Sequence, residues 1–150
     1  MVVSTVPDGQ LTVENLSLRV GDVSFAYRRF GNKETTTPAL VMLQHFRGNL
    51  DNWDPALVDR LAQDREVILL DNRGVGGSTG VVPENVTAMA RDALAFIDAL
   101  GLEQIDLLGF SLGGHVAQEL VLLRPRLVRR LVVSPEKVGH PGDGRVVAEG

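Results

Sequence analysis

Apolar and polar positions follow two different patterns along the chain. Residues 16–31 alternate between apolar and polar side chains on either side of Gly21-Asp22, which predicts a two-stranded antiparallel hairpin at a sheet edge. Later segments are almost continuously apolar, and such runs are typical of strands covered on both faces of a parallel sheet. These strands are predicted at residues 39–43, 66–70, 105–108 and 127–133.

Three helices are predicted between and after these strands. Asp54 followed by Pro55 is an N-cap with proline at the first helical position, and it opens the first helix. An apolar stripe at helical spacing that ends at Gly101 predicts the second, and Pro125 stops the third. The alternation of strand and helix predicts an α/β fold with a mostly parallel, doubly wound sheet and an antiparallel N-terminal hairpin. The helices are expected at residues 54–63, 86–100 and 112–123.

Composition and charge narrow the class of protein. The 150 residues are 44% hydrophobic with a formal net charge of -4, which fits one soluble globular domain and no nucleic-acid partner. The chain has no cysteine, so disulfides and thiolate metal sites are excluded, and His45, His115 and His140 lack the spacing of metal ligands. Because no apolar run is long enough to span a membrane and the start lacks a basic signal region, we expect a cytoplasmic protein without a membrane partner.

The strongest chemical signal is a Gly-x-Ser-x-Gly pentapeptide centred on Ser111. A strand is predicted directly before it and a helix directly after it, which argues against a chance match in a chain with 16 glycines. A serine becomes an effective nucleophile at a sharp strand-to-helix turn, and Gly109 and Gly113 give such a turn room. The same turn places the backbone N–H of Leu112 at a helix N-terminus, where it can donate to an oxyanion.

Other residues admit competing interpretations. His115 lies one helical turn after Ser111, so its side chain points along the helix, and we expect it to pack under the sheet. His45 lies in a loop, where a histidine is usually solvated. Residues 74–80 are rich in glycine but lack the lysine and the helix start of a phosphate-binding loop. The arginines between 124 and 130 are interpreted as a solvated face.

Two upstream segments, together with the pentapeptide, resemble the α/β-hydrolase fold family over almost the whole chain to about residue 133. Residues 71–78 match the family's Asp-x-Arg-Gly-x-Gly-x-Ser pattern, whose loop is a structural support, so Asp71 and Arg73 receive no chemical role. Residues 44–53 match the family's oxyanion loop when they are aligned on Trp53, with Gln44 and His45 in place of the common His-Gly pair.

The resemblance implies a serine hydrolase that cleaves an ester or related acyl bond of a small molecule through an acyl-enzyme on Ser111. The backbone N–H groups of Phe46 and Leu112 would form the oxyanion hole. Neither a metal nor an organic cofactor is implied. In the family, the acid and the histidine of the triad follow the serine on later strands.

The segment after Ser111 departs from that pattern. The hydrolase-like domain is predicted to span residues 1–133, truncated after about the sixth strand, and the Gly/Pro-rich tail of residues 134–150 is expected to be irregular. His140 and Asp143 in this tail have the chemistry of the triad's acid and histidine, but they occur in the reverse order. We therefore expect impaired activity, and the alternative is an inactive fragment or pseudo-hydrolase that binds a ligand or a protein.

The end of the predicted sheet also suggests a partner. If the strand at residues 127–133 is the last, it leaves an open edge and an uncovered apolar face. We therefore expect a homodimer or a partner chain to cover this edge.

Overall fold

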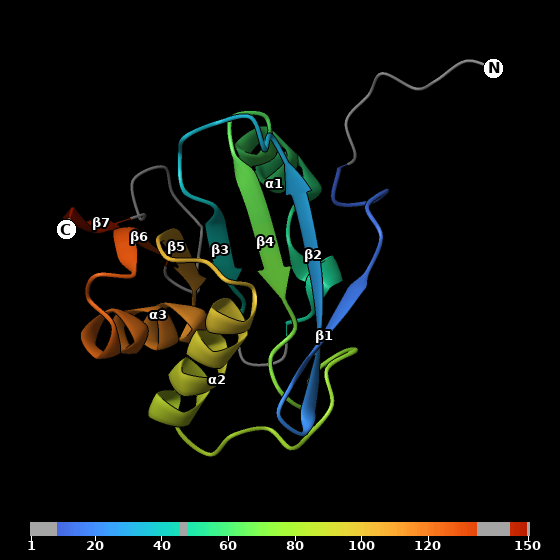
Figure 1. The fold of residues 1–150 in the computed structure, drawn as a ribbon, viewed down its shortest axis with the longest axis vertical. Coiled ribbons are helices and arrows are strands. Elements are labelled where there is room, and N and C mark those ends of the chain that lie inside the picture. Colours follow the sequence, from blue (N-terminus) through green and yellow to red (C-terminus); the bar gives the residue numbers. More distant parts are fainter. Residues whose placement is uncertain (1–8, 46–47, 135–144, 150) are drawn as a thin grey trace.

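The computed structural model describes residues 9–45, 48–134 and 145–149. Within these residues the strands form one seven-stranded sheet in the order β1-β2-β4-β3-β5-β6-β7 (Figure 1). The strands are β1 (Leu16–Val20), β2 (Val23–Gly31), β3 (Leu40–Leu43), β4 (Glu66–Leu70), β5 (Ile105–Phe110), β6 (Val128–Ser134) and β7 (Arg145–Glu149).

The sheet is parallel at its centre and antiparallel at its margins. Strands β4, β3, β5 and β6 run parallel to one another, whereas β1 and β2 form the predicted hairpin and β2 pairs antiparallel with β4. The predicted α/β fold with an antiparallel N-terminal hairpin is therefore confirmed. Because Leu43 pairs with Gly109 and Phe110 with Ser134, the carboxyl ends of β3, β5 and β6 meet at one edge of the sheet.

Helices cover both faces of this sheet. They are α1 (Pro55–Ala62), α2 (Val86–Ala99) and α3 (Leu112–Leu123), and a short 3₁₀ turn, η1 (Leu50–Asn52), precedes α1. Figure 1 shows α2 and α3 together on one face and α1 on the other. The Asp54 carboxylate caps α1 by accepting the N–H of Ala56 at 3.0 Å, as its Asp-Pro start predicts. No helix in the described ranges is long and apolar enough to cross a membrane.

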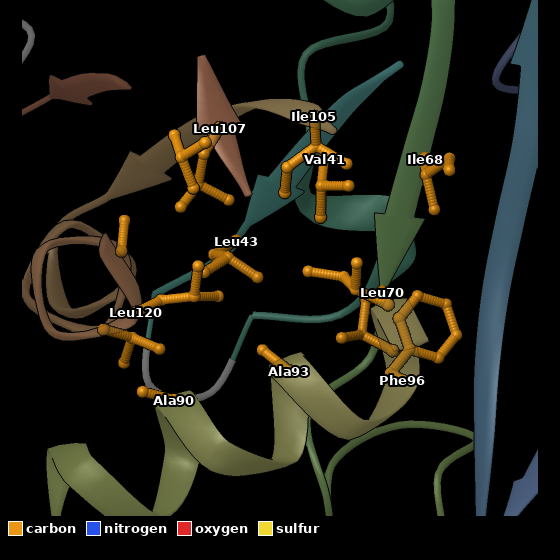
Figure 2. Packing of buried hydrophobic residues seen from close by; sticks show 14 of the residues in the cluster. Val41, Leu43, Ile68, Leu70, Ala90, Ala93, Phe96, Ile105, Leu107 and Leu120 are labelled. Carbon is orange, nitrogen blue, oxygen red and sulfur yellow. The ribbon is translucent and has the colours of Figure 1, made fainter. Parts of the chain in front are cut away.

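The central strands carry apolar side chains on both faces because successive strand residues point in opposite directions. On one face they pack against α2 and α3, and Phe96 of α2 also meets the ring of Tyr27 with 5.2 Å between the ring centroids. On the other face, Met42 and Leu69 pack against α1 and Trp53. Figure 2 shows the first core, which includes Val41, Leu43, Ile68, Leu70, Ala90, Ala93, Phe96, Ile105, Leu107 and Leu120.

The last strand corrects one expectation from the sequence. Strand β7 pairs antiparallel with β6, so β6 is not an open edge and the tail after residue 133 is not irregular throughout. The reason is that an antiparallel partner needs only a short run with β propensity, and Arg145-Val-Val-Ala-Glu149 provides it. The inferred homodimer or partner chain stays a prediction, without the open β6 edge as its reason.

A buried carboxylate lies near the amino end of the parallel strands. Asp106 of β5 is 2% exposed, and it accepts hydrogen bonds from Arg65, before β4, at 2.7 Å and from Arg129 of β6 at 2.6 and 3.0 Å. Burial by itself raises the pKa of Asp106, but the hydrogen bonds and charges of Arg129 and Arg65 outweigh it and lower the pKa below its ordinary value. The carboxylate therefore connects three segments of the sheet.

Stability in acid is predicted to depend on Asp106. Because its pKa is lower in the folded than in the unfolded chain, its stabilising effect is complete above the unfolded pKa of roughly 3.9 and is lost as pH falls through the lower folded pKa. In Asp106→Asn, this acid dependence should disappear, and the free energy of unfolding at pH 7 should drop by about 2 kcal/mol. Urea denaturation between pH 2 and 7 measures both effects.

The matched control is Asp98→Asn. Asp98 pairs with Arg124 at 2.6 Å, but both side chains are exposed, so this substitution should cost less than about 1 kcal/mol. Equal acid sensitivity of Asp106→Asn and the unsubstituted chain would contradict the assignment.

Candidate active site

The sharp strand-to-helix turn predicted around Ser111 is present. Strand β5 ends at Phe110, α3 begins at Leu112, and Ser111 between them has φ 56° and ψ -120°. Ser111 is the one non-glycine residue with a positive φ in the described chain. Such a backbone costs of order 1–3 kcal/mol and persists where its surroundings fix it. Here the Ser111 N–H donates to the Ser134 carbonyl at 2.9 Å, and the Ser111 carbonyl accepts the N–H of Gly114 at 2.9 Å.

Two glycines allow the backbone to pack this closely. A Cβ atom at Gly109 would overlap the carbonyl oxygen of Gly113 and lie 2.7 Å from Cα of Gly114. A Cβ atom at Gly113 would overlap the carbonyl oxygen of Leu43 and lie 2.7 Å from that of Gln44. The first turn of α3 therefore packs backbone to backbone against both β5 and the carboxyl end of β3, which agrees with the room predicted for these glycines.

Ser111 occupies the N-cap position of α3 without capping the helix. An N-cap serine normally accepts the N–H of the second or third helical residue, but the Ser111 side chain makes no such bond. Its hydroxyl is half-buried and is not committed to the helix. Leu112 is the first helical residue, so its N–H has no acceptor within the helix, and the positive end of the helix dipole lies there.

The loop after β3 lies beside this turn. The side chain of Gln44 is buried, and its Oε1 accepts the N–H of His45 at 3.1 Å. The N–H of Gly48 donates to the His45 carbonyl at 3.0 Å. Phe46, the second predicted oxyanion donor, lies outside the described residues, and its role stays a prediction.

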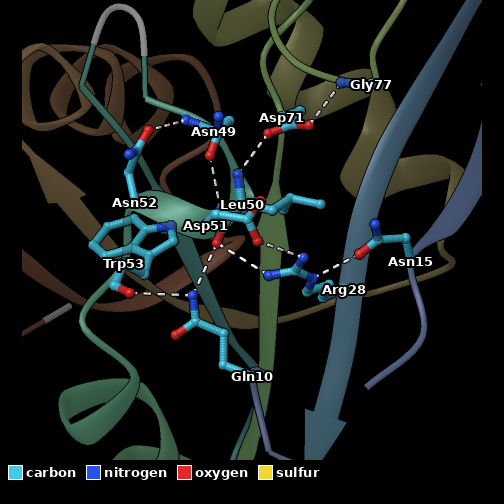
Figure 3. Close-up of polar contacts among 10 residues, drawn as sticks. All are labelled: Gln10, Asn15, Arg28, Asn49, Leu50, Asp51, Asn52, Trp53, Asp71 and Gly77. Carbon is cyan, nitrogen blue, oxygen red and sulfur yellow. Dashed lines mark hydrogen bonds and ion pairs between the residues drawn. The ribbon is translucent and has the colours of Figure 1, made fainter. Parts of the chain in front are cut away.

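The far end of this loop is held by one buried carboxylate (Figure 3). Asp71 follows β4 directly and is 3% exposed. Its Oδ1 accepts the N–H of Leu50 at 2.8 Å, and its Oδ2 accepts the N–H of Gly77 at 3.0 Å. Asp71 therefore joins the loop after β3 to the Gly-rich loop after β4.

The surroundings of Asp71 disfavour the charged form of its carboxyl group. Burial raises the pKa of Asp71 above its ordinary value. The hydrogen bonds from the N–H groups of Gly77 and Leu50, followed by the charge of Arg28, oppose this rise without cancelling it.

Two more polar side chains hold the loop from the N-terminal side (Figure 3). Arg28 of β2 donates to the Leu50 carbonyl at 3.3 Å and to the Asp51 carboxylate at 2.7 Å. The side-chain amide of Gln10 donates to the carbonyls of Leu50 at 2.9 Å and of Trp53 at 3.2 Å. Both the N–H and the C=O of Leu50 are thus bound by buried side chains.

Aromatic rings lie beside the turn. The ring of Phe110, directly before Ser111, contacts the ring of His45 with 5.9 Å between centroids and lies 6.4 Å from that of Trp53. Trp53 is 6% exposed and belongs to the core on the α1 face. This side of the turn therefore has an aromatic wall.

The two described histidines, His45 and His115, form no hydrogen bond to the Ser111 hydroxyl. His115 is exposed, so the expectation that it packs under the sheet is wrong; the inward positions of α3 are taken by neighbours such as Gly114 and Val116. Among the described residues, no hydrogen bond joins the Ser111 hydroxyl to His45 or His115. His140 lies outside the described residues, as does Asp143.

The remaining contacts of the Asp-x-Arg-Gly loop hold the fold together. Arg73 donates to Asp92 of α2 at 2.7 Å, and a Cβ atom at Gly76 would overlap the Asp71 carboxylate. In the part of the chain that the structure describes, no group of three or more His, Cys, Asp or Glu side chains is placed to hold a metal ion.

A surface groove of about 530 Å³ lies at the other end of α3, lined in part by Leu123, Arg124 and Leu127. Because α3 has 12 residues and a helix rises about 1.5 Å per residue, this groove is about 18 Å from the turn at Ser111. It belongs to a different end of the sheet.

The turn at Ser111 is predictable from the sequence, whereas the residues that hold the neighbouring loop are not. Ser111, Leu112 and the Gly-rich loop were located from local motifs. Arg28 and Gln10 were missed, because their partners lie more than twenty residues away and neither is part of a motif. Asp71 carried one usable signal, a carboxylate directly after a buried strand.

Comparison with known proteins agrees with this geometry. A sequence model of the alpha/beta hydrolase fold family matches residues 38–135. The chain is 31% identical over 118 residues to a protein of Agrobacterium fabrum named "Putative carbamate hydrolase RutD", covering 77% of this chain and 45% of that protein. It is 34% identical over 123 residues to the mouse sn-1-specific diacylglycerol lipase ABHD11, covering 80% of this chain and 38% of the lipase.

A solved structure is similar in its fold as well. The alpha/beta hydrolase fold protein from Chitinophaga pinensis superposes with a TM-score of 0.81 at 40% identity, covering 85% of this chain and 46% of that one. The chain thus spans less than half the length of each of these relatives. This chain belongs to the alpha/beta hydrolase fold family, and the residues that match the family model include the turn at Ser111.

Substitution of Gly113 should disrupt the contact between α3 and β3. Gly113→Ala places a Cβ on the carbonyls of Leu43 and Gln44, which are backbone atoms that cannot move aside cheaply. We expect a loss of about 2–3 kcal/mol in the free energy of unfolding, measured by urea denaturation. Gly114→Ala is the control, because its Cβ meets the side-chain methyl of Val133 at 2.6 Å, whereas the Gly109 carbonyl oxygen, a backbone atom, is at an ordinary contact distance of 3.5 Å. If both variants are equally stable, the contact does not constrain the turn.

Asp71→Asn tests the loop anchor. An asparagine of the same shape can accept only one of the two N–H groups and turns its own NH₂ toward the other. The expected loss is about 2 kcal/mol at pH 7, with faster hydrogen exchange of whichever N–H, that of Leu50 or that of Gly77, faces the NH₂ group. Asp54→Asn is the control, because asparagine caps a helix as well as aspartate does. Unchanged exchange at both Leu50 and Gly77 would show that Asp71 does not hold the two loops together.

Proposed function

We propose that this chain carries the nucleophile of a serine hydrolase that cleaves an ester or a related acyl bond of a small molecule. Ser111 is the nucleophile and the N–H groups of Leu112 and Phe46 form the oxyanion hole. The observation that carries this proposal is the positive φ of Ser111 at the N-cap of α3, together with a hydroxyl that makes no capping bond to the helix. The N–H of Leu112 beside it is free of helical acceptors because Leu112 is the first helical residue.

The reaction follows from these groups. The Oγ of Ser111 bonds to the acyl carbon while its proton passes to a general base, and the carbonyl oxygen becomes an oxyanion facing the Leu112 N–H. The leaving group departs with a proton, and water then hydrolyses the acyl-enzyme. One well-placed oxyanion donor contributes about 10²–10³ in turnover.

The relatives support an acyl substrate in general terms. The names of two of them specify a carbamate and a diacylglycerol, and both compounds contain a carbonyl carbon bonded to oxygen. The aromatic wall of Phe110, His45 and Trp53 suits an apolar acyl group beside Ser111. No cofactor takes part in this scheme, and the cytoplasmic location stays a prediction.

An inactive fragment or pseudo-hydrolase that binds a ligand or another protein is the second candidate. The observation in its favour is that no described histidine forms a hydrogen bond to the Ser111 hydroxyl. Loss of the base of a serine triad costs about 10⁶ in turnover, so the chain would bind acyl compounds without turning them over.

Labelling with a fluorophosphonate probe tests the proposal. The purified chain should be labelled at Ser111, as located by peptide mapping, because Oγ attacks the phosphorus and displaces fluoride in the same way as it would attack an acyl carbon and displace the leaving group. Added imidazole should accelerate the labelling if the chain lacks its own base.

Two variants control this experiment. Ser111→Ala should abolish the label with and without imidazole, whereas Ser17→Ala, at an exposed serine of β1 that bonds to Ser24 at 2.6 Å, should leave it unchanged. No label on the unsubstituted chain under either condition would reject the hydrolase proposal and favour the binding module.

A further inference from the structure

The side-chain NH₂ group of Gln44, in the loop after β3, is not used by any interaction described so far. The side chain of Gln44 is 2% exposed, and its Nε2 has no hydrogen-bond partner in the described chain. Its Oε1 accepts the N–H of His45, and an N–H requires an acceptor, so this contact fixes which end of the amide faces which way. The NH₂ group is therefore a buried donor without an acceptor.

The backbone of the loop lies directly on this side chain. A Cβ atom at Gly48 would overlap Cγ of Gln44 and lie 2.7 Å from its Cδ and 3.0 Å from the ring nitrogen of His45. The N–H of Gly48 closes the turn onto the His45 carbonyl at 3.0 Å. Gln44 thus fills the space under the turn, and glycine at position 48 lets the backbone lie against it.

The same residue touches the nucleophile turn through its main chain. The Gln44 carbonyl oxygen lies 2.7 Å from the position of a Cβ at Gly113, in the first turn of α3. A buried donor without an acceptor costs about 1–3 kcal/mol, and such groups are rare in native proteins. An unpaired NH₂ group at this place, between the loop after β3 and the nucleophile turn, therefore points to a role for Gln44 beyond filling space.

We propose that Gln44 is a positioning residue of the site described under Proposed function, on which this inference rests. Its Oε1 fixes the chain direction at His45, its aliphatic part supports Gly48, and its Nε2 donates to an oxygen acceptor that enters the site. The acceptor is either a buried water or the acyl oxygen of the substrate. Gln44 acts on the reaction by holding the loop against α3.

Two substitutions separate these effects. Gln44→Met keeps the shape but removes both the acceptor and the donor. Gln44→Glu keeps an acceptor for the His45 N–H. Gln63→Met is the matched control, because Gln63 is an exposed glutamine at the end of α1.

Hydrogen exchange and labelling kinetics give independent measurements on the full chain. In Gln44→Met, the His45 N–H should exchange at least about tenfold faster, because hydrogen-bonded amides exchange only when the structure opens. The maximal rate of fluorophosphonate labelling should fall by about the same factor. Gln44→Glu should restore both toward the unsubstituted chain, and Gln63→Met should change neither.

The apparent affinity for the probe identifies the acceptor. An apparent affinity that is unchanged in Gln44→Met indicates that Nε2 binds a water. An apparent affinity that weakens in both Gln44 variants indicates that Nε2 binds the acyl oxygen. Either result supports the proposal. Unchanged exchange at His45 in a folded Gln44→Met variant overturns it. If the unsubstituted chain is not labelled, the proposed function fails, and the exchange measurement alone decides whether Gln44 positions the loop.

Discussion

The first turn of α3 touches the end of β3 with no side chain between them, and the geometry of the site depends on this contact. Gly113 lies against the carbonyls of Leu43 and Gln44, and Gly109 lies against Gly113 in turn. Because backbone atoms meet backbone atoms, neither segment can shift without moving the other. The positive φ of Ser111 is sustained by this packing, and the loop after β3 is held at a fixed place beside the hydroxyl.

Two buried carboxylates stabilise the sheet at opposite ends, and they do so in different ways. Asp106, near the amino end, faces the guanidinium groups of Arg65 and Arg129, which outweigh burial and lower its pKa. Asp71, at the carboxyl end, accepts two backbone N–H groups, and burial prevails so that its pKa is raised. The amino end is held by charge pairs, whereas the carboxyl end is held by hydrogen bonds that join the loops after β3 and β4.

The elements with a strong periodic pattern were predictable from the sequence. The hairpin, the four parallel strands and the three helices follow from apolar spacing and from end signals such as Asp54-Pro55 and Gly101. The strand at Arg145–Glu149 was not predictable, because five residues after a Gly/Pro-rich segment carry a weak pattern and the pairing with β6 is what stabilises them. The packing of His115 was predicted wrongly, because spacing alone does not say which side of α3 faces the sheet.

The residues of the candidate site likewise differ in how far the sequence predicts them. Ser111 and Leu112 follow from a local motif whose neighbours set the backbone, so the sequence located them. The anchors of the neighbouring loop, Arg28 and Gln10, come from distant segments and depend on how the strands are ordered. Gln44 lies between these two cases. Its position in the motif was visible in the sequence, but its unpaired NH₂ group is seen only in the folded structure, where Gly48 packs against its side chain.

The backbone conformation of Ser111 sets the geometry of the candidate site, and a high-resolution crystal structure of this chain would determine it. We expect a positive φ near 56° at Ser111 and a hydroxyl that makes no bond to the first turn of α3. The N–H of Leu112 should then have no acceptor from the protein. A serine with negative φ whose hydroxyl caps the N–H of Gly113 or Gly114 would contradict the account.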